Sequence, residues 1–260
     1  MLCSFIAGGE RLYLDLGQDS DIIFTMISIQ SQQPLQTVRD IPLFRGLSDD
    51  HWHQLSAIAK AVIFERGRLI FQEGDAAEGF YVVTGGKVKV FKLSAEGKEQ
   101  ILHIYGPGHP IGEVPVFSGN CFPANAMALV KSRLYYFPRK AFLALITEHP
   151  SLCMNMLAVL SMRLREFTTQ IENLSLKEVP GRLAAYLLYL ANEQKRPQTV
   201  HLPLSKGQLA SLLGTIPETL SRIFNKMSAH GLIAVEGAEI ALLDYEGLAD
   251  LAEFGKLAEG

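Results

Sequence analysis

Three polar residues late in the chain, Glu218, Ser221 and Arg222, stand at positions i, i+3 and i+4. On an α-helix this spacing places the three side chains on one face. A carboxylate can accept a hydrogen bond from cytosine N4, and a guanidinium can bridge O6 and N7 of guanine. Near the N-terminal end of a helix that enters the major groove, the set could therefore read DNA base pairs. Two simpler roles compete: Glu218 as the acid of a helix cap, and Ser221 and Arg222 as solvated helix surface.

The segments around these residues predict a helix-turn-helix. Ser205 and Gln208 have the spacing of a capping box, and the helix that they open stops at Gly214. Residues 215–218 repeat the signature and open a second helix, which ends near His230. Two short helices separated by one glycine-containing turn are typical of a helix-turn-helix.

Small and apolar residues stand where such a motif needs them. Ala210 suits the crossing of the helices, Gly214 suits a turn with positive φ, and Leu220 suits the core. The other predicted buried positions are Leu209, Leu213 and Ile223. Segments 232–235 and 238–243 then flank Glu236-Gly237 and predict a β-hairpin, or wing.

Positive charge is concentrated around the same motif, although the net charge of the whole chain is −3. Between residues 195 and 230, five lysines and arginines stand against one acid, and from residue 231 onward seven acids stand against one lysine. A basic segment of this kind fits the phosphate backbone of DNA. The residues predicted to contact phosphates or to position the helix are Ser205, Lys206, Thr215, Pro217, Thr219 and Lys226.

One long helix is predicted over residues 150–176. Its apolar residues alternate spacings of four and three, which is the pattern of a coiled-coil seam. The seam consists of Cys153, Leu157, Leu160, Leu164, Phe167, Ile171 and Leu174. We expect this seam to pair two copies of the chain, and an ordinary core helix is the alternative.

Residues 61–137 have the pattern of short β-strands. The predicted strands cover 61–65, 68–71, 79–84, 87–93, 99–105, 124–129 and 132–137, and glycine-containing turns separate them. Regular short strands of this kind favour an antiparallel barrel or jelly roll. Ahead of them, Ser48 is predicted as the N-cap of a helix that contains Trp52 and Leu55.

Composition limits the class of protein. The 260 residues are 48% apolar, enough for one large core or two modest ones, and no run of 18 apolar residues predicts a membrane span. Cys3, Cys121 and Cys153 stand far apart, which fits a reducing cytoplasm and argues against a disulfide framework or a thiolate metal site. Residues 1–33 are predicted as an N-terminal extension without a secretory signal, and translation could begin at Met26 instead.

Residues 38–246 resemble the cyclic-AMP-receptor/FNR (CRP/FNR) superfamily of bacterial transcription regulators. The run from Pro217 to Arg222 matches the DNA-reading stretch of the family, and Gly112-Glu113 with Val116-Phe117 matches its sensor loop. The resemblance implies a homodimer that binds a palindromic operator in double-stranded DNA, with TTG-containing half-sites, and that contacts RNA polymerase. Residues 97–102 and 173–176 look most like the nitrosative-stress branch, the regulators of dissimilatory nitrate respiration and of the hybrid-cluster protein.

The resemblance also locates a sensor site. Members that bind cyclic AMP hold its phosphate with an Arg-Ser pair, whereas the matching place here contains Phe122-Pro123-Ala124. Because a buried phosphate without a cation carries a large desolvation cost, we expect no cyclic AMP. The N-terminal cysteine cluster of FNR-type regulators is absent, so we also expect no iron–sulfur cluster. The predicted effector pocket consists of Gly112, Glu113, Phe117, Phe122, Pro123, Ala124, Leu157 and Leu160.

The nitrosative-stress branch senses nitric oxide, and some of its members use haem. The predicted pocket is mostly apolar, as a porphyrin needs, and His103 or His109 would be the axial ligand of haem b. Against this, a single histidine in a β-roll is more often surface or core than a ligand.

Two other classes of protein stay open. His103, His109 and Glu113 on a β-roll also resemble the ligands of cupin metalloenzymes, but the His-x-His pair of cupins is missing. A structural dimer that does not bind DNA is the second alternative. We favour a cytoplasmic, non-enzymatic regulator without a membrane partner, and activation or repression of its genes stays open.

The predicted fold is α+β, with an antiparallel β-roll (jelly-roll) sensor, a dimerisation helix and a winged helix-turn-helix. The predicted segments are the N-terminal extension 1–33, the sensor 34–149, the helix 150–176, the winged helix-turn-helix 177–248 and a C-terminal tail 249–260.

Overall fold

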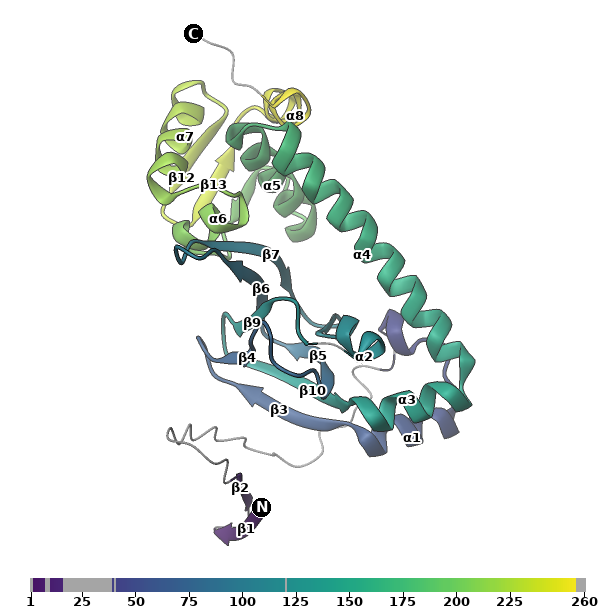
Figure 1. The fold of residues 1–260 in the computed structure, drawn as a ribbon. Helices are drawn as coiled ribbons and strands as arrows, with labels where there is room; N and C mark the ends of the chain where they lie inside the picture. Colours follow the sequence, from purple (N-terminus) through teal and green to yellow (C-terminus); the bar gives the residue numbers. More distant parts are fainter. Residues whose placement is uncertain (1, 8–9, 16–38, 40, 120, 256–260) are drawn as a thin grey trace. The chain divides into compact units, whose positions relative to one another are not determined.

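The computed structural model describes residues 2–7, 10–15, 39, 41–119 and 121–255. The chain divides into two compact units, Met1–Lys92 with Leu102–Leu160 and Leu93–Ile101 with Ser161–Gly260. The first consists mainly of β-sheet with short helices, and the second consists of helices with a small sheet (Figure 1). This confirms the predicted α+β class. In the part of the chain that the structure describes, no single helix is long and apolar enough to cross a membrane. Only the helix pair Arg139–Glu148 and Pro150–Leu176, which is bent by 114°, passes that test jointly.

Two four-stranded antiparallel sheets lie mainly in the first unit, with strand orders β3-β10-β5-β8 and β4-β9-β6-β7. Their strands are β3 (Lys60–Phe64), β4 (Leu69–Phe71), β5 (Gly79–Gly85), β6 (Val88–Leu93), β7 (Glu99–Tyr105), β8 (Pro110–Ile111), β9 (Asn125–Ala128) and β10 (Ser132–Pro138). Strands far apart in the sequence pair, as β3 does with β10. Strands β1 (Leu2–Ala7) and β2 (Glu10–Asp15) pair with each other, and the rest of the predicted extension lies outside the described residues.

Helices share a buried aromatic core with these sheets. Helix α1 (Asp49–Ile58) begins at Ser48, whose Oγ accepts a hydrogen bond from His51 N at 3.3 Å, as predicted. Helix α3 (Arg139–Glu148) leads into α4 (Pro150–Leu176), which has the predicted bounds. The core contains Phe44, Phe80, Phe137 and Phe142, together with Leu152, Met156 and Val159 of α4.

The second unit contains the predicted helix-turn-helix and wing. Its elements are α5 (Val179–Gln194), β11 (Thr199–His201), α6 (Lys206–Leu212), α7 (Pro217–Ala229), β12 (Ile233–Glu236), β13 (Glu239–Leu242) and α8 (Tyr245–Phe254). The wing is a β12–β13 hairpin whose turn contains Gly237 with φ +63°. Helices α5 and α8 approach closely at Gly181, where a Cβ would lie 2.6 Å from the Cα of Gly255.

Some further elements differ from the sequence pattern. Strand β8 and helix α2 (Val114–Ser118) are not predicted, because each is too short to show a period. Helix α8 continues to Phe254 and ends at Gly255, so helical structure extends into the segment assigned to a tail.

Candidate nucleic-acid interface and effector site

Helices α6 and α7 and the turn between them form the helix-turn-helix. Helix α6 begins with a complete capping box: Gln208 N donates to Ser205 Oγ at 3.3 Å, and Ser205 N donates to Gln208 Oε1 at 3.0 Å. Ala210 is buried, and Thr215 N donates to its carbonyl at 2.9 Å. The turn between the helices is therefore closed at Gly214, whose φ of +69° favours glycine.

Arg182 of α5 holds this turn, a contact that no sequence pattern indicates. Its Nη1 donates to the Leu213 carbonyl at 2.5 Å, and its Nε donates to the Lys177 carbonyl at 2.9 Å. A Cβ on Gly214 would lie 3.1 Å from Arg182 Nη1 and 3.1 Å from Leu174 Cδ2. Burial lowers the pKa of Arg182 from its usual value, but a guanidinium stays charged in proteins. Arg182 thus ties the turn to the α4–α5 junction.

The outer face of α7 carries the residues predicted to read bases. Glu218 and Arg222 are exposed and Ser221 is half-buried, whereas Leu220, Ile223, Phe224 and Met227 are buried on the opposite face. Arg222 Nη2 donates to Thr219 Oγ1, one turn earlier in the helix, at 3.4 Å. Among the residues that the structure describes, neither Glu218 nor Arg222 forms an ion pair. Both are therefore available to an external partner.

The start of α7 differs from the predicted cap. The N-cap is Ile216 rather than Thr215, and it makes no side-chain hydrogen bond to the helix. Pro217, with its fixed φ, takes the first helical position and places the cap at the residue before it. Glu218 then lies in the first turn, where the helix dipole favours an acid. The proposed role of Glu218 as the acid of a capping box is therefore wrong.

The residues predicted to contact phosphates lie at the starts and exposed sides of the two helices. Ser205, Lys206, Pro217 and Lys226 are exposed, and Thr215 and Thr219 are half-buried. The Ser205 hydroxyl accepts the cap hydrogen bond and keeps its O–H to donate. Pro217 has no N–H, so it cannot donate to a phosphate.

In the first unit, aromatic rings fill the place where the sequence locates the phosphate site. Gly112 has φ +71°, and a Cβ there would lie 2.8 Å from Phe122 Cε1 and 3.0 Å from Phe71 Cε1. The rings of Phe71 and Phe122 stack with centroids 4.0 Å apart and planes 11° apart. Phe122 is only 6% exposed. The space against the Gly112 backbone is thus occupied by side chains of the protein itself.

Tyr81 extends this aromatic group, with its ring centroid 6.2 Å from that of Phe71. Burial raises the pKa of Tyr81 to about 12, and neighbouring Tyr136 adds to the shift. The phenol is therefore neutral at physiological pH. Neither the rings nor this hydroxyl supplies a positive charge for a buried anion.

Two cations near the sensor loop are bonded to other groups. Lys92 Nζ donates to the Pro123 carbonyl at 2.9 Å and pairs with Glu73. Arg139 Nε donates to the Val116 carbonyl at 2.5 Å and so supports α2. Both side chains therefore already have partners within the protein.

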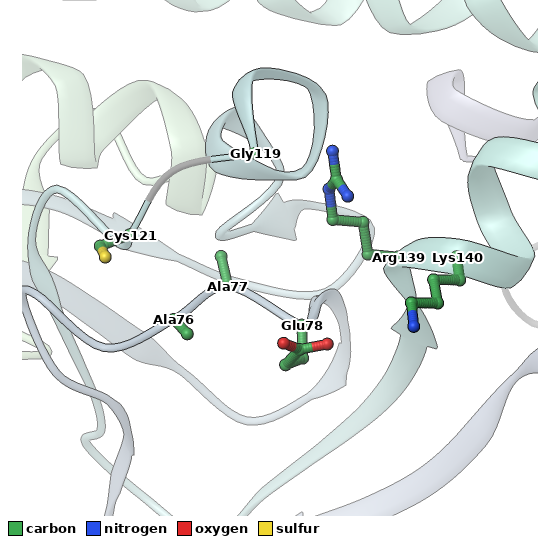
Figure 2. A pocket seen from close by; sticks show the side chains of 7 residues that line it. All are labelled: Ala76, Ala77, Glu78, Gly119, Cys121, Arg139 and Lys140. Atoms are coloured by element: carbon green, nitrogen blue, oxygen red, sulfur yellow. The ribbon is translucent and has the colours of Figure 1, made fainter.

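Arg139 also lines a cavity of about 170 Å³ next to α2. Figure 2 shows its lining, which consists of Ala76, Ala77, Glu78, Gly119, Cys121, Arg139 and Lys140. None of these residues belongs to the predicted effector pocket. The cavity is therefore a separate feature of the first unit.

The structure brings together only part of the predicted effector pocket. Gly112 meets Phe122, and Glu113 and Ala124 are also buried. In contrast, Phe117 is 39% exposed, Leu157 is 51% exposed and Pro123 is exposed, while Leu160 is half-buried. The apolar residues are thus divided between a packed interior and an open surface.

The two candidate histidines flank Tyr105. The His103 ring lies 4.3 Å from the Tyr105 ring between centroids, and the Tyr105 ring lies 6.0 Å from that of His109. His109 is exposed, with Nδ1 3.3 Å from the Gly106 carbonyl. Within the described ranges, no group of three or more His, Cys, Asp or Glu side chains could hold a metal ion.

The predicted seam of α4 is largely uncovered in the single chain. Leu164 is 68% exposed and Ile171 is 65% exposed, and Leu157 and Phe167 are exposed as well. Cys153, Leu160 and Leu174 are half-buried. The α4 residues that pack in the core of the same chain are Leu152, Met156 and Val159, which are not members of the seam. The seam therefore forms an apolar stripe that is separate from the face used in the core.

Comparison with known proteins gives matches along most of the chain. A cyclic nucleotide-binding domain model matches residues 61–149, and a Crp-like helix-turn-helix domain model matches residues 181–251. The cyclic AMP receptor protein of Thermus thermophilus is 32% identical over 208 residues, covering 78% of this chain and 95% of that protein. The fumarate and nitrate reduction regulatory protein of Escherichia coli is 28% identical over 192 residues, covering 72% and 76%. A solved CRP/FNR-family transcriptional regulator of Thermus thermophilus is 27% identical with a TM-score of 0.61, covering 75% of this chain and all of that one.

Proposed function

Because the chain belongs to the CRP/FNR family of transcription regulators, we propose that two copies pair along α4, read a palindromic operator with α7 and respond to nitric oxide through haem. The family supports the coarser statement directly: the protein is a DNA-binding transcription regulator that responds to an effector, and it is not an enzyme. The cupin alternative is thereby wrong. The observation that carries the DNA-reading proposal is the outer face of α7, where Glu218 and Arg222 are exposed and form no ion pair with any residue that the structure describes.

Pairing along α4 is supported by its uncovered seam. Burial of exposed leucine, isoleucine and phenylalanine side chains is favourable by about 1.5–3 kcal/mol for each side chain that becomes fully buried. The seam spacing of four and three suits a second parallel helix. A two-fold axis along α4 would relate two identical reading helices, and these would require half-sites one DNA turn apart, about 34 Å.

The operator that we propose has TTG-containing half-sites, of the TTGAT or TTGTGA type. The support is the family resemblance of residues 217–222 and the three side chains that α7 exposes. Glu218 can accept from cytosine N4, and Arg222 can donate to guanine, so each can read one base pair. Lys206 and Lys226 would contact phosphates at either side of the groove. RNA polymerase in the cytoplasm is the proposed protein partner.

Cyclic AMP is expected not to bind, although one relative is named as its receptor. The Phe71–Phe122 stack occupies the space against Gly112, and no arginine follows Glu113 at the matching place. Isothermal titration with cyclic AMP should therefore give no heat of binding at micromolar protein, and operator affinity should not change. Micromolar binding would contradict this prediction and direct attention to another arginine, Arg133, as the phosphate ligand.

The chain contains imidazole side chains that can bind haem iron. When bound, haem iron would supply a site for nitric oxide, and His103 or His109 would hold it. If His109 Nδ1 donates to the Gly106 carbonyl, from which it lies 3.3 Å away, Nε2 would be left to bind the iron. Exposed Val114 and Phe117 on α2 offer apolar surface for a porphyrin, whereas the packed rings above Gly112 leave no room for one. We propose that such an effector shifts the population of two packings of the paired α4 helices.

Reconstitution with haem tests this proposal. We expect one haem per chain, a Soret band that nitric oxide shifts, and an operator affinity that nitric oxide changes by about tenfold, a typical coupling between two sites. Replacement of the histidine that binds the iron, by His109→Ala or by His103→Ala, should remove the Soret band. The matched control is His53→Ala, because His53 is an exposed histidine on α1. The absence of a Soret band, or an operator affinity that nitric oxide does not change, would contradict the haem proposal. The protein would then be a regulator of the same fold with a different small effector.

A further inference from the structure

The cavity next to α2 is lined by charged side chains of both signs. Arg139 and Lys140 belong to the first turn of α3, and Glu78 directly precedes β5 (Figure 2). The rest of the lining consists of the small residues Ala76, Ala77, Gly119 and Cys121. The volume of about 170 Å³ is below the roughly 300–1,000 Å³ of pockets that hold drug-sized ligands. The cavity therefore suits a molecule with few heavy atoms.

The charged groups around this cavity do not neutralise one another by direct contact. Among the residues that the structure describes, no ion pair involves Glu78, Arg139 or Lys140. The Arg139 side chain is half-buried, whereas Glu78 and Lys140 are exposed. Two cations and one carboxylate thus stand around the same space, each with hydrogen-bonding atoms that an occupant of the cavity can use.

Arg139 is held in position at the wall of the cavity. Its Nε donates to the Val116 carbonyl at 2.5 Å, and its backbone N donates to the Glu78 carbonyl at 2.7 Å. A Cβ on Gly119 would lie 3.3 Å from Arg139 Nη2, so the guanidinium lies close to the glycine backbone. Because Nε is already bonded, a ligand would meet the Nη atoms of a guanidinium whose orientation is fixed. Such a planar group matches the geometry of a carboxylate.

We propose that this cavity binds a small zwitterion of the amino-acid class, which carries one carboxylate and one ammonium group. Arg139 and Lys140 would donate to the carboxylate, and Glu78 would accept from the ammonium group. A simple anion would be repelled by Glu78, and a simple cation would be repelled by the two basic side chains. The site is separate from the outer face of α7 and from the histidines proposed to hold haem, so this inference goes beyond the proposed function.

Isothermal titration with a panel of small zwitterions tests the proposal. The probes are the common α-amino acids, β-alanine and γ-aminobutyrate, which differ in the separation of their two charges. Acetate and ethylamine, which carry one charged group each, are the controls. We expect at least one zwitterion to bind with a dissociation constant of about 1 mM or below, which so small a ligand can reach. Acetate and ethylamine should bind about tenfold more weakly or not at all, because each leaves one charged partner unused.

Variants of the lining should weaken binding of that zwitterion. Glu78→Gln and Arg139→Gln should each weaken it about tenfold, the effect of one hydrogen bond between charged groups. Lys140→Gln should weaken it about threefold, because Lys140 is exposed and its charge is screened by solvent. The matched controls are Glu148→Gln, at the other end of α3, and Lys131→Gln, both exposed and outside the lining. Arg139 also supports α2, so the exposed Glu78 and Lys140 variants keep the test valid if Arg139→Gln does not fold.

The thiol of Cys121 locates the bound ligand. Cys121 is exposed and lines the cavity, whereas Cys153 is half-buried on α4 outside it. The zwitterion should slow alkylation of Cys121 by iodoacetamide and leave Cys153 unchanged, as measured by mass spectrometry of the two peptides.

Three results would overturn the proposal. The first is a panel in which no zwitterion binds. The second is binding of acetate as tight as that of the best zwitterion, with no loss in Glu78→Gln, which would indicate a plain anion site. The third is binding that leaves alkylation of Cys121 unchanged, which would place the ligand elsewhere. Operator reading is measured separately by gel shift and does not depend on any of these results.

Discussion

Replacement of Leu164 by glutamate is expected to convert the protein into a monomer and to abolish binding to a palindromic operator. Leu164 lies in the middle of the proposed seam and is 68% exposed in the single chain. In a paired seam, two copies of the new carboxylate would face each other in a dry interface. An unpaired buried charge of this kind costs several kcal/mol. Because the side chain lies outside the core of its own chain, the monomer should keep its fold.

Sedimentation velocity and a gel shift would measure both effects. Met162→Glu is the matched control, because Met162 is an exposed apolar residue of α4 outside the seam. That variant should stay dimeric and keep its operator affinity. A Leu164→Glu protein that sediments as a dimer would show that the two copies meet elsewhere or that the stripe packs within one chain.

The second large effect is expected at Arg222. Arg222→Ala should weaken operator binding by about 1–3 kcal/mol and relax the preference at one base pair of each half-site. The reason is that a bidentate contact to guanine would be lost while the fold is unchanged, since Thr219 is the one hydrogen-bond partner of the guanidinium among the described residues. Gel shifts against operators that vary one base pair at a time would locate the affected position.

Lys226→Ala provides the contrast for Arg222→Ala. Lys226 is exposed on the same helix and is proposed to contact a phosphate. Its loss should weaken binding to all sequences alike and reduce the salt dependence by about one ion. If Arg222→Ala showed that same uniform loss, or no loss, Arg222 would not be a base-reading residue.

The regular elements of this protein are predictable from local sequence. The long helix follows from a seven-residue apolar repeat that extends without interruption from Cys153 to Leu174, and its bounds agree with the structure. The capping box at Ser205 and the glycine turn at Gly214 are also local signals, and both are confirmed. The predicted N-cap of α7, Thr215, is wrong. A threonine favours the N-cap position, but a proline favours the first helical position, and the fixed φ of Pro217 places the cap at Ile216 instead.

The surroundings of the candidate sites are much less predictable. Arg182 holds the helix-turn-helix turn, but its partner Leu213 lies a helix and a strand away in the sequence. Phe71 stacks on Phe122 only because β4 and the segment before β9 meet in the folded roll. Such contacts depend on the arrangement of elements and not on the pattern of any one element. The sequence thus shows that position 122 is a phenylalanine and not an arginine, and the structure shows that its ring packs on Phe71.

The Phe71–Phe122 stack also restricts how this sensor could change in evolution. A single Phe122→Arg substitution would not create a nucleotide site, because the new guanidinium would enter a packed aromatic interior beside Phe71. The desolvation cost of that charge would destabilise the intermediate protein. Removal of the Phe71 ring first would instead leave a cavity, which also costs stability. We therefore expect the effects of substitutions at the two positions to depend on each other, and a change from an aromatic interior to an anion site would need coordinated changes in β4 and in the segment before β9.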